Sequence, residues 1–143
     1  MAAINLSTPF KGFDAESFSF NTRAEPRMFD RQFDLMGRLL DLGLDVYAYA
    51  TFTSPPRPGA EVHRAMRRFV DRLQELDENL PLRTVPLEIK VFTPVERRLG
   101  TGQAAGLAGQ VPAIEAWQEE LARRYPGHRQ SASVADVPLH GRR

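Results

Sequence analysis

The first strong pattern of hydrophobic positions in the chain is helical. Four large apolar residues recur at intervals of three and four positions, which places them on one side of a helix: Phe29, Phe33, Met36 and Leu40. Pro26 suits a first turn and Gly43 a left-handed stop, so the pattern predicts a helix over residues 26–42. A second stripe, with charged residues on the opposite side, predicts a helix over residues 60–77.

Strand patterns lie on either side of these helices. Residues 44–53 are apolar on both alternations and rich in β-branched and aromatic side chains, which is typical of a strand in a parallel sheet covered on both faces. Residues 85–93 alternate apolar with polar side chains, which predicts a half-exposed strand at the edge of a sheet. A further strand is expected over residues 4–12. We predict that the strands run parallel and are joined by right-handed crossovers.

This order of elements defines an α/β protein with a layer of about three parallel strands and flanking helices. A parallel sheet is normally covered on both faces, and the chain has too few helices for that. The deficit predicts missing strands, supplied either by a partner subunit or by a longer parent chain. We expect a partial (β/α) barrel segment over residues 1–99, a C-terminal helical extension over 100–125 whose helix follows Pro112, and a loosely ordered tail over 126–143.

Composition narrows the class of function. Lys plus Arg number 19 against 18 for Asp plus Glu, a net charge of +1, so no strong field attracts nucleic acid or an anionic membrane. Cysteine is absent and there are 3 histidines, which excludes disulfides and thiolate nucleophiles and argues against a structural zinc site. No segment approaches the roughly 20 apolar residues of a membrane span, and we see no signal peptide, so we expect a cytoplasmic protein.

Polar residues stand at the carboxyl ends of the first two predicted strands, where ligands bind in α/β sheets. Lys11 either faces a ligand or is a solvated loop lysine, and Asp14 either faces a ligand or caps a helix. The hydroxyls of Thr51 and Thr53 either bond a ribose or a carboxylate, or belong to ordinary strand and turn residues.

Other candidate residues also have two interpretations. Arg97 and Arg98 follow the third predicted strand, where they either clamp a phosphate or carboxylate of a substrate or belong to a solvated surface paired with Glu96. Tyr47 and Tyr49 share one face of their strand and fit core or barrel-lining positions better than a base-stacking platform. A solvated basic face is expected on the second helix, made of Arg64, Arg67, Arg68 and Arg72. The chain has no phosphate loop and no nucleophile motif.

Three segments together resemble the later strands of radical SAM proteins, enzymes with a partial (β/α) barrel. The segments are Phe-Lys-Gly-Phe-Asp-Ala-Glu-Ser-Phe from residue 10, Gly-Leu-Asp-Val-Tyr-Ala-Tyr-Ala-Thr-Phe-Thr from residue 43 and Pro-Leu-Glu-Ile-Lys-Val-Phe-Thr-Pro-Val-Glu-Arg-Arg-Leu from residue 86. In that family a Cys-x-x-x-Cys-x-x-Cys loop holds a [4Fe-4S] cluster that binds S-adenosylmethionine and cleaves it to a radical. None of those cysteines exists here, and iron-sulfur clusters are held by thiolates.

The resemblance therefore implies the C-terminal part of a radical SAM protein, a partial (β/α) barrel-like layer that is a fragment of a larger barrel and is not catalytically competent alone. S-adenosylmethionine and the [4Fe-4S] cluster are implied for the full-length family, while this chain itself would hold neither. By resemblance, Lys11, Thr51 and Thr53 face the cofactor and substrate. The expected partner is a missing N-terminal half or a second copy of the chain, and neither nucleic acid nor a membrane. The alternative is a small non-catalytic α/β interaction module that binds a partner through its exposed sheet edge and the helix of Trp117.

Overall fold

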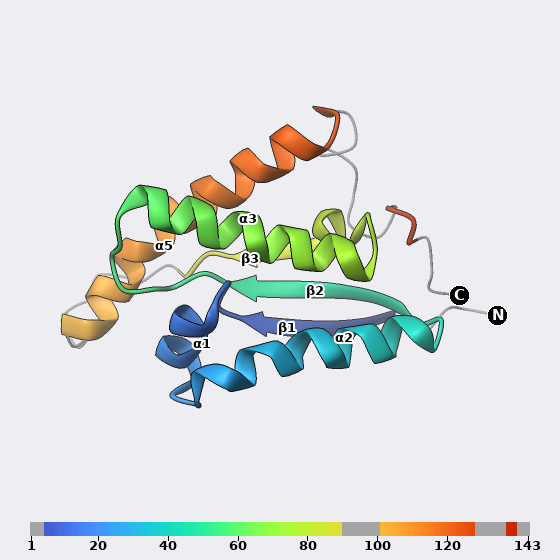
Figure 1. Cartoon of the computed structure of the whole chain (residues 1–143), viewed down its shortest axis with the longest axis horizontal. Helices are drawn as coiled ribbons and strands as arrows, with labels where there is room; N and C mark the ends of the chain where they lie inside the picture. Colours follow the sequence, from blue (N-terminus) through green and yellow to red (C-terminus); the bar gives the residue numbers. More distant parts are fainter. Residues whose placement is uncertain (1–4, 90–100, 128–136, 140–143) are drawn as a thin grey trace.

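A three-stranded parallel sheet forms the centre of the molecule (Figure 1). The computed structural model describes residues 5–89, 101–127 and 137–139. Within them the strands are β1 (Asn5–Lys11), β2 (Asp45–Thr51) and β3 (Thr84–Leu87), in the spatial order β1-β2-β3. Both neighbouring pairs are parallel, which confirms the predicted α/β class and strand pairing. The sequence predicts this last strand over residues 85–93, but β3 ends at Leu87 and residues 88–89 are not part of it; residues 90–93, Arg97 and Arg98 lie outside the described residues.

The two predicted central helices are confirmed. After β1 come α1 (Ala15–Thr22), a 3₁₀ turn η1 (Pro26–Asp30) and α2 (Arg31–Asp41); α3 (Gly59–Leu76) and the 3₁₀ turn η2 (Leu80–Arg83) lead from β2 to β3. Gly43 ends the segment after α2 with a φ of 72°, the left-handed conformation expected of it. The hydrophobic pattern does not predict α1, because this short helix buries only Ser17 and Phe18.

The last helix, α5 (Thr101–Arg124), begins well before the predicted start, and Pro112 lies inside it. The stretch before Pro112 is rich in glycine, which is typical of a loop. The glycines have a packing reason instead, because a Cβ on Gly109 would come within 1.9 Å of the carbonyl oxygen of Ser54. The backbone N–H of Ser54 also donates to the carbonyl of Gly106 at 3.3 Å, so the helix runs close against the loop after β2.

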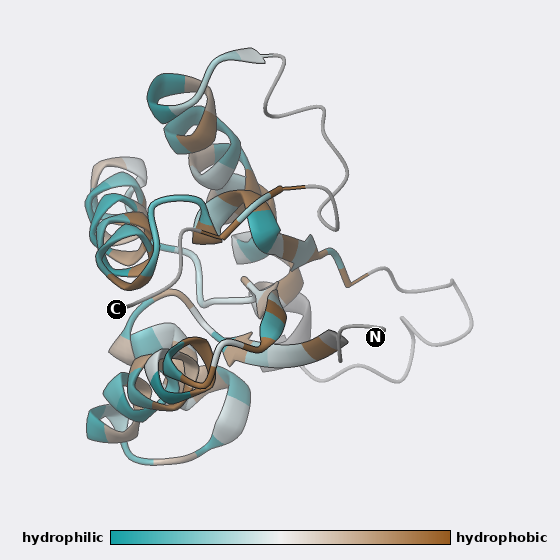
Figure 2. Cartoon of the chain, turned by 90° about the vertical axis from the view of Figure 1, so that its right-hand side faces the viewer, coloured by the Kyte–Doolittle hydropathy of each residue, from teal (hydrophilic) through white to brown (hydrophobic). Residues whose placement is uncertain are grey.

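The helices cover one face of the sheet (Figures 1 and 2). Along β1, Thr8 and Phe10 are buried, while Ser7, Pro9 and Lys11 on the opposite face are exposed. Along β2, three residues of the covered face have no exposed surface: Val46, Ala48 and Ala50. The other face is called the open face, and it carries Ser7, Pro9, Lys11, Tyr47, Tyr49, Thr51, Val85 and Leu87.

An aromatic cluster joins the covered face to the helices. The ring of Phe10 lies 5.1 Å from that of Phe33 on α2 and 5.7 Å from that of Phe69 on α3. Trp117 of α5 packs against Phe52 and Phe69 at 5.5 and 6.0 Å and is 1% exposed. The side chain of Trp117 therefore belongs to the core, so a partner that binds its helix would have to contact the exposed residues of α5 instead.

Candidate functional site

Lys11 ends β1 on the open face. Its side chain is exposed, and its Cα is in register with that of Thr51 on β2. Gly12 follows with a φ of 77° and donates its N–H to the carbonyl of Thr51 at 2.9 Å. A Cβ at Gly12 would lie 2.4 Å from the backbone nitrogen of Phe18, so only glycine lets the chain turn from the strand end into α1. The Lys-Gly pair thus places an ammonium group at the carboxyl end of the sheet.

The two threonines differ from Lys11 in their surroundings. Thr51 lies in the same row of the sheet as Lys11 and is 7% exposed. Thr53 is 6% exposed, and its hydroxyl donates to the side-chain carbonyl of Asn21 on α1. The Asn21 amide in turn donates to the carbonyl of Thr53 at 2.8 Å. Lys11 and Thr51 are therefore brought together at the strand ends, whereas the Thr53 hydroxyl contributes to docking α1.

Two tyrosines dominate the middle of the open face. The rings of Tyr47 and Tyr49 are 5.4 Å apart and nearly perpendicular, at 72°. The pKa of Tyr49 is raised, chiefly because its hydroxyl shares a hydrogen bond with that of Tyr47. Both side chains are half-buried, and a phenol hydroxyl can donate to or accept from a group placed over the sheet.

Glutamine side chains cap both edges of the sheet at its carboxyl end. On the β1 edge, the N–H of Lys11 donates to Oε1 of Gln32 at 2.7 Å. Beyond β3, the N–H of Ile89 donates to Oε1 of Gln110 at 2.8 Å, and the Gln110 amide donates back to the carbonyl of Ile89 at 3.1 Å. These amides occupy backbone groups that a further strand would otherwise use.

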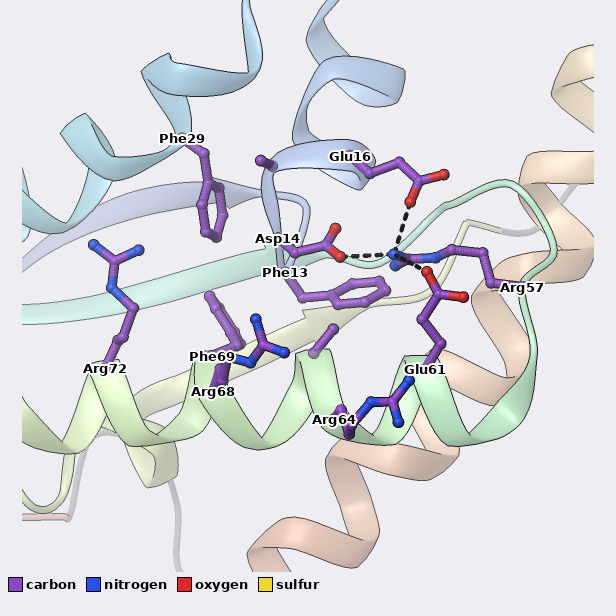
Figure 3. Close-up of a pocket in the computed structure, with 12 residues that line it drawn as sticks. Phe13, Asp14, Glu16, Phe29, Arg57, Glu61, Arg64, Arg68, Phe69 and Arg72 are labelled. Atoms are coloured by element: carbon purple, nitrogen blue, oxygen red, sulfur yellow. Dashed lines mark hydrogen bonds and ion pairs between the residues drawn. The ribbon is translucent and has the colours of Figure 1, made fainter.

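A buried arginine that the sequence patterns do not single out holds the loop between β2 and α3 (Figure 3). The side chain of Arg57 is 7% exposed, and its Nη1 donates to Asp14 at 2.7 Å and to Glu16 at 2.9 Å. Glu61 lies 3.9 Å from the same nitrogen, and the guanidinium carbon is 5.1 Å from the centre of the Phe13 ring. The only sequence signal for this role is the position of Arg57 between two prolines. Prolines restrict the backbone, so the loop keeps the arginine close to the sheet.

Asp14 combines helix capping with this ion pair. Its carboxylate accepts the N–H of Ser17 at 2.9 Å, while the Ser17 hydroxyl accepts the N–H of Asp14 at 3.1 Å, a reciprocal capping box. Burial by itself raises the pKa of Asp14, but the hydrogen bonds from Arg57 and Ser17 together with the Arg57 charge outweigh it, and the pKa is lowered. Of the two interpretations of Asp14, capping is the one that the structure shows.

Neither a metal site nor a membrane-spanning helix is found among the described residues. They contain no group of three or more His, Asp or Glu side chains that could hold a metal ion. None of their helices is both long and apolar enough to cross a membrane. No protein-family model, no curated protein and no solved structure matches this chain.

Proposed function

We propose that this chain is the C-terminal portion of a radical SAM-type protein and that it is not catalytically competent alone. The open face is the observation that carries the proposal. In a (β/α) barrel the helices surround the outside, and the other face of each strand lines the interior. The sheet here has that one-sided arrangement, with Lys11, Tyr47 and Tyr49 on the face that would be the interior.

The chain would supply positioning groups and no radical chemistry. Because it contains no cysteine, its residues do not fit a [4Fe-4S] cluster, and a cluster would have to be held by another polypeptide. The Lys11 ammonium at the strand end could pair with a carboxylate or phosphate of a bound cofactor or substrate. The tyrosine hydroxyls would provide hydrogen bonds along the interior wall. The proposal includes the cytoplasmic location that the sequence favours.

Fragment complementation tests the proposal. The chain is co-expressed with N-terminal halves of radical SAM proteins that carry Cys-x-x-x-Cys-x-x-Cys, beginning with any such half encoded beside it. We expect a stable complex which, after anaerobic reconstitution with iron and sulfide, shows cluster absorption and, when supplied with a chemical one-electron reductant, cleaves S-adenosylmethionine to methionine and deoxyadenosine. The chain alone is expected to do neither, so stoichiometric cluster uptake by the purified chain would contradict the proposal.

Substitutions on the open face make this test specific. Lys11→Ala combined with Thr51→Val should reduce S-adenosylmethionine cleavage by the complex while the two halves still co-purify. Arg38→Ala is the matched control, because Arg38 is an exposed cation on α2, on the covered side of the sheet. Equal losses from both changes would show that the open face has no special part in the reaction.

One observation favours the alternative, a small non-catalytic interaction module. The N–H of Gly12 faces β2, so by alternation the nitrogens of Lys11 and Pro9 face away from it. Gln32 already accepts the Lys11 N–H, and Pro9 has no N–H to offer, as is common in a strand that ends a sheet. If the chain binds no N-terminal half and stays a stable monomer, the interaction module is favoured, and since Gln32 caps the β1 edge, its binding surface would be the open face in place of the sheet edge expected from the sequence.

A further inference from the structure

A cavity lies on the covered side of the sheet, between α1 and α3. Its volume is about 500 Å³, within the usual range for small-ligand sites. It begins at the loops that follow β1 and β2, and carboxyl ends of parallel strands are where α/β proteins bind ligands. Its apolar lining comes from Phe13, Ala15, Phe29, Ala65 and Phe69. We call this cavity the α1–α3 cleft (Figure 3).

Charges are separated along the cleft. At one end, Asp14, Glu16 and Glu61 surround Arg57. Along the rest of α3, successive turns carry arginines that line the cleft: Arg64, Arg68 and Arg72. The acidic groups are therefore concentrated where one guanidinium already pairs with them, and the remaining wall is basic.

Two of these arginines have no counter-ion within the cleft. Among the described residues, no carboxylate forms an ion pair with Arg64 or Arg68, and both side chains are exposed. Arg72, by contrast, pairs with Asp30 at 2.6 Å and lies 3.8 Å over the ring of Phe33. Since Arg64 and Arg68 are four residues apart, their side chains project from one side of α3 about 6 Å apart along the helix axis.

Arg57 gives an independent sign of a missing partner. Its Nε and Nη2 are buried and have no hydrogen-bond acceptor in the described part of the chain, although the side chain is 93% buried and lines the cleft. Buried donors without an acceptor are uncommon in folded proteins and require a water, an ion or a ligand as explanation. The donors at the acidic end and the unpaired cations along α3 thus frame the same cavity.

We propose that the α1–α3 cleft binds an organic phosphate that carries a flat ring, such as a mononucleotide. The phosphate would lie between Arg64 and Arg68, because adjacent guanidinium groups can each donate more than one N–H to its oxygens. The ring would lie over the apolar lining between Phe13 and Phe29 and bring a hydrogen-bond acceptor toward Arg57. The cleft is separated from the open face by the sheet itself, so this inference does not depend on the function proposed above.

Binding measurements with three probes test the two halves of the ligand. Isothermal titration calorimetry of the full chain is performed with adenosine monophosphate, adenosine and inorganic phosphate. We expect adenosine monophosphate to bind at least about tenfold more tightly than either part, because only it meets both the arginines and the apolar lining. Equal affinity for inorganic phosphate would overturn the ring contact, and equal affinity for adenosine would overturn the phosphate contact.

A matched pair of double variants tests the location. Arg64→Gln with Arg68→Gln should weaken adenosine monophosphate binding by more than about tenfold, since two charge-assisted contacts are lost. Arg31→Gln with Arg38→Gln removes the same charge from exposed positions on α2 outside the cleft and should change the affinity less than about twofold. Circular dichroism melts check that both variants fold. Equal weakening in both variants, or in neither, would overturn the proposed site.

Discussion

The two faces of the sheet are formed by the same strands but differ in what covers them. On the covered face, small apolar residues of β2 leave room for a cluster of phenylalanine rings from α2 and α3. On the open face, the alternate residues are large and can form hydrogen bonds, with Tyr47, Tyr49 and Lys11 half-buried or exposed. Stability should therefore depend on one face, while the other is left able to bind.

The comparison also shows how an apolar strand can mislead. The residues of β2 look apolar on both faces of the strand because tyrosine, like the aliphatic residues, is common in strands. In the structure only one face is covered by helices (Figure 2). A tyrosine tolerates a half-buried position since its ring packs on its neighbour and its hydroxyl keeps a polar partner. The Tyr47–Tyr49 pair meets both requirements within a single strand.

The largest expected effect comes from comparing one substitution on the covered face with one on the open face. Phe69→Ala removes a fully buried ring that contacts Phe10, Phe52 and Trp117, and should lower the free energy of unfolding by about 3–5 kcal/mol. Tyr49→Ala, on the open face, should cost less than about 1.5 kcal/mol. Urea denaturation measures both. Comparable losses would show that the open face is covered in the isolated chain.

Glycine substitutions sharpen the comparison at the ends of the covered layer. Gly12→Ala should cost about 2 kcal/mol or more, because the added Cβ meets the backbone of Phe18 as well as a φ of 77°. Gly43→Ala has a similar φ of 72° but open space around the Cβ, so it should cost about 1 kcal/mol. The difference between the two midpoints of thermal unfolding measures the cost of the steric clash between the added Cβ at residue 12 and the backbone of Phe18. Equal shifts would mean that α1 moves away at little cost.

A pH-dependent effect is expected from Asp14, where the covered layer meets the β2–α3 loop. Its pKa is lower in the folded chain than the ordinary 3.8, so the carboxylate stabilises the fold above that pH and loses its contribution as pH falls through the lowered value. Asp14→Asn keeps a capping side chain but loses the charge, and should cost about 1–2 kcal/mol at neutral pH. That cost should shrink in acid.

The control for Asp14→Asn is Glu75→Gln, which removes an exposed carboxylate from α3. Its effect should stay within about 0.5 kcal/mol at every pH. The measurement is a series of denaturation curves collected from neutral to strongly acidic pH. The same pH dependence in both variants would argue against the role of the Asp14–Arg57 pair.

The smallest effect concerns the apolar surface of the open face. An uncovered sheet face with two tyrosine rings should bind a hydrophobic dye, and Tyr47→Ser with Tyr49→Ser should lower the dye fluorescence while the folded state is retained in a cooperative melt. Ser54→Ala, at a buried position in the loop after β2, serves as a control that should not lower it. Dye binding that is unaffected by the tyrosines would place the exposed apolar surface elsewhere.

The elements with strong local periodicity could be predicted from the sequence. The helical stripe of Phe29 and Phe33 and the stop at Gly43 correspond to η1 and α2, and the alternation near Val85 corresponds to an edge strand. Lys11 and Thr51 were also predicted at the same sheet edge, because parallel strands end together. In each case the pattern depends on residues a few positions apart in the chain, which is why it can be read without the fold.

Packing between distant segments sets which surfaces are covered and which charges meet. α1 and the early start of α5 depend on packing against Thr53 and the loop of Ser54. A local sequence pattern carries no information about such contacts. Arg57 meets Asp14 across 43 positions of the sequence, and that contact forms one end of the α1–α3 cleft. Periodicity is local, so the sequence predicts β1, β2, β3, α2 and α3, and their alternation along the chain predicts the parallel order of the strands. The open face, the cleft and the Arg57 network needed the fold, because they arise where distant segments pack together.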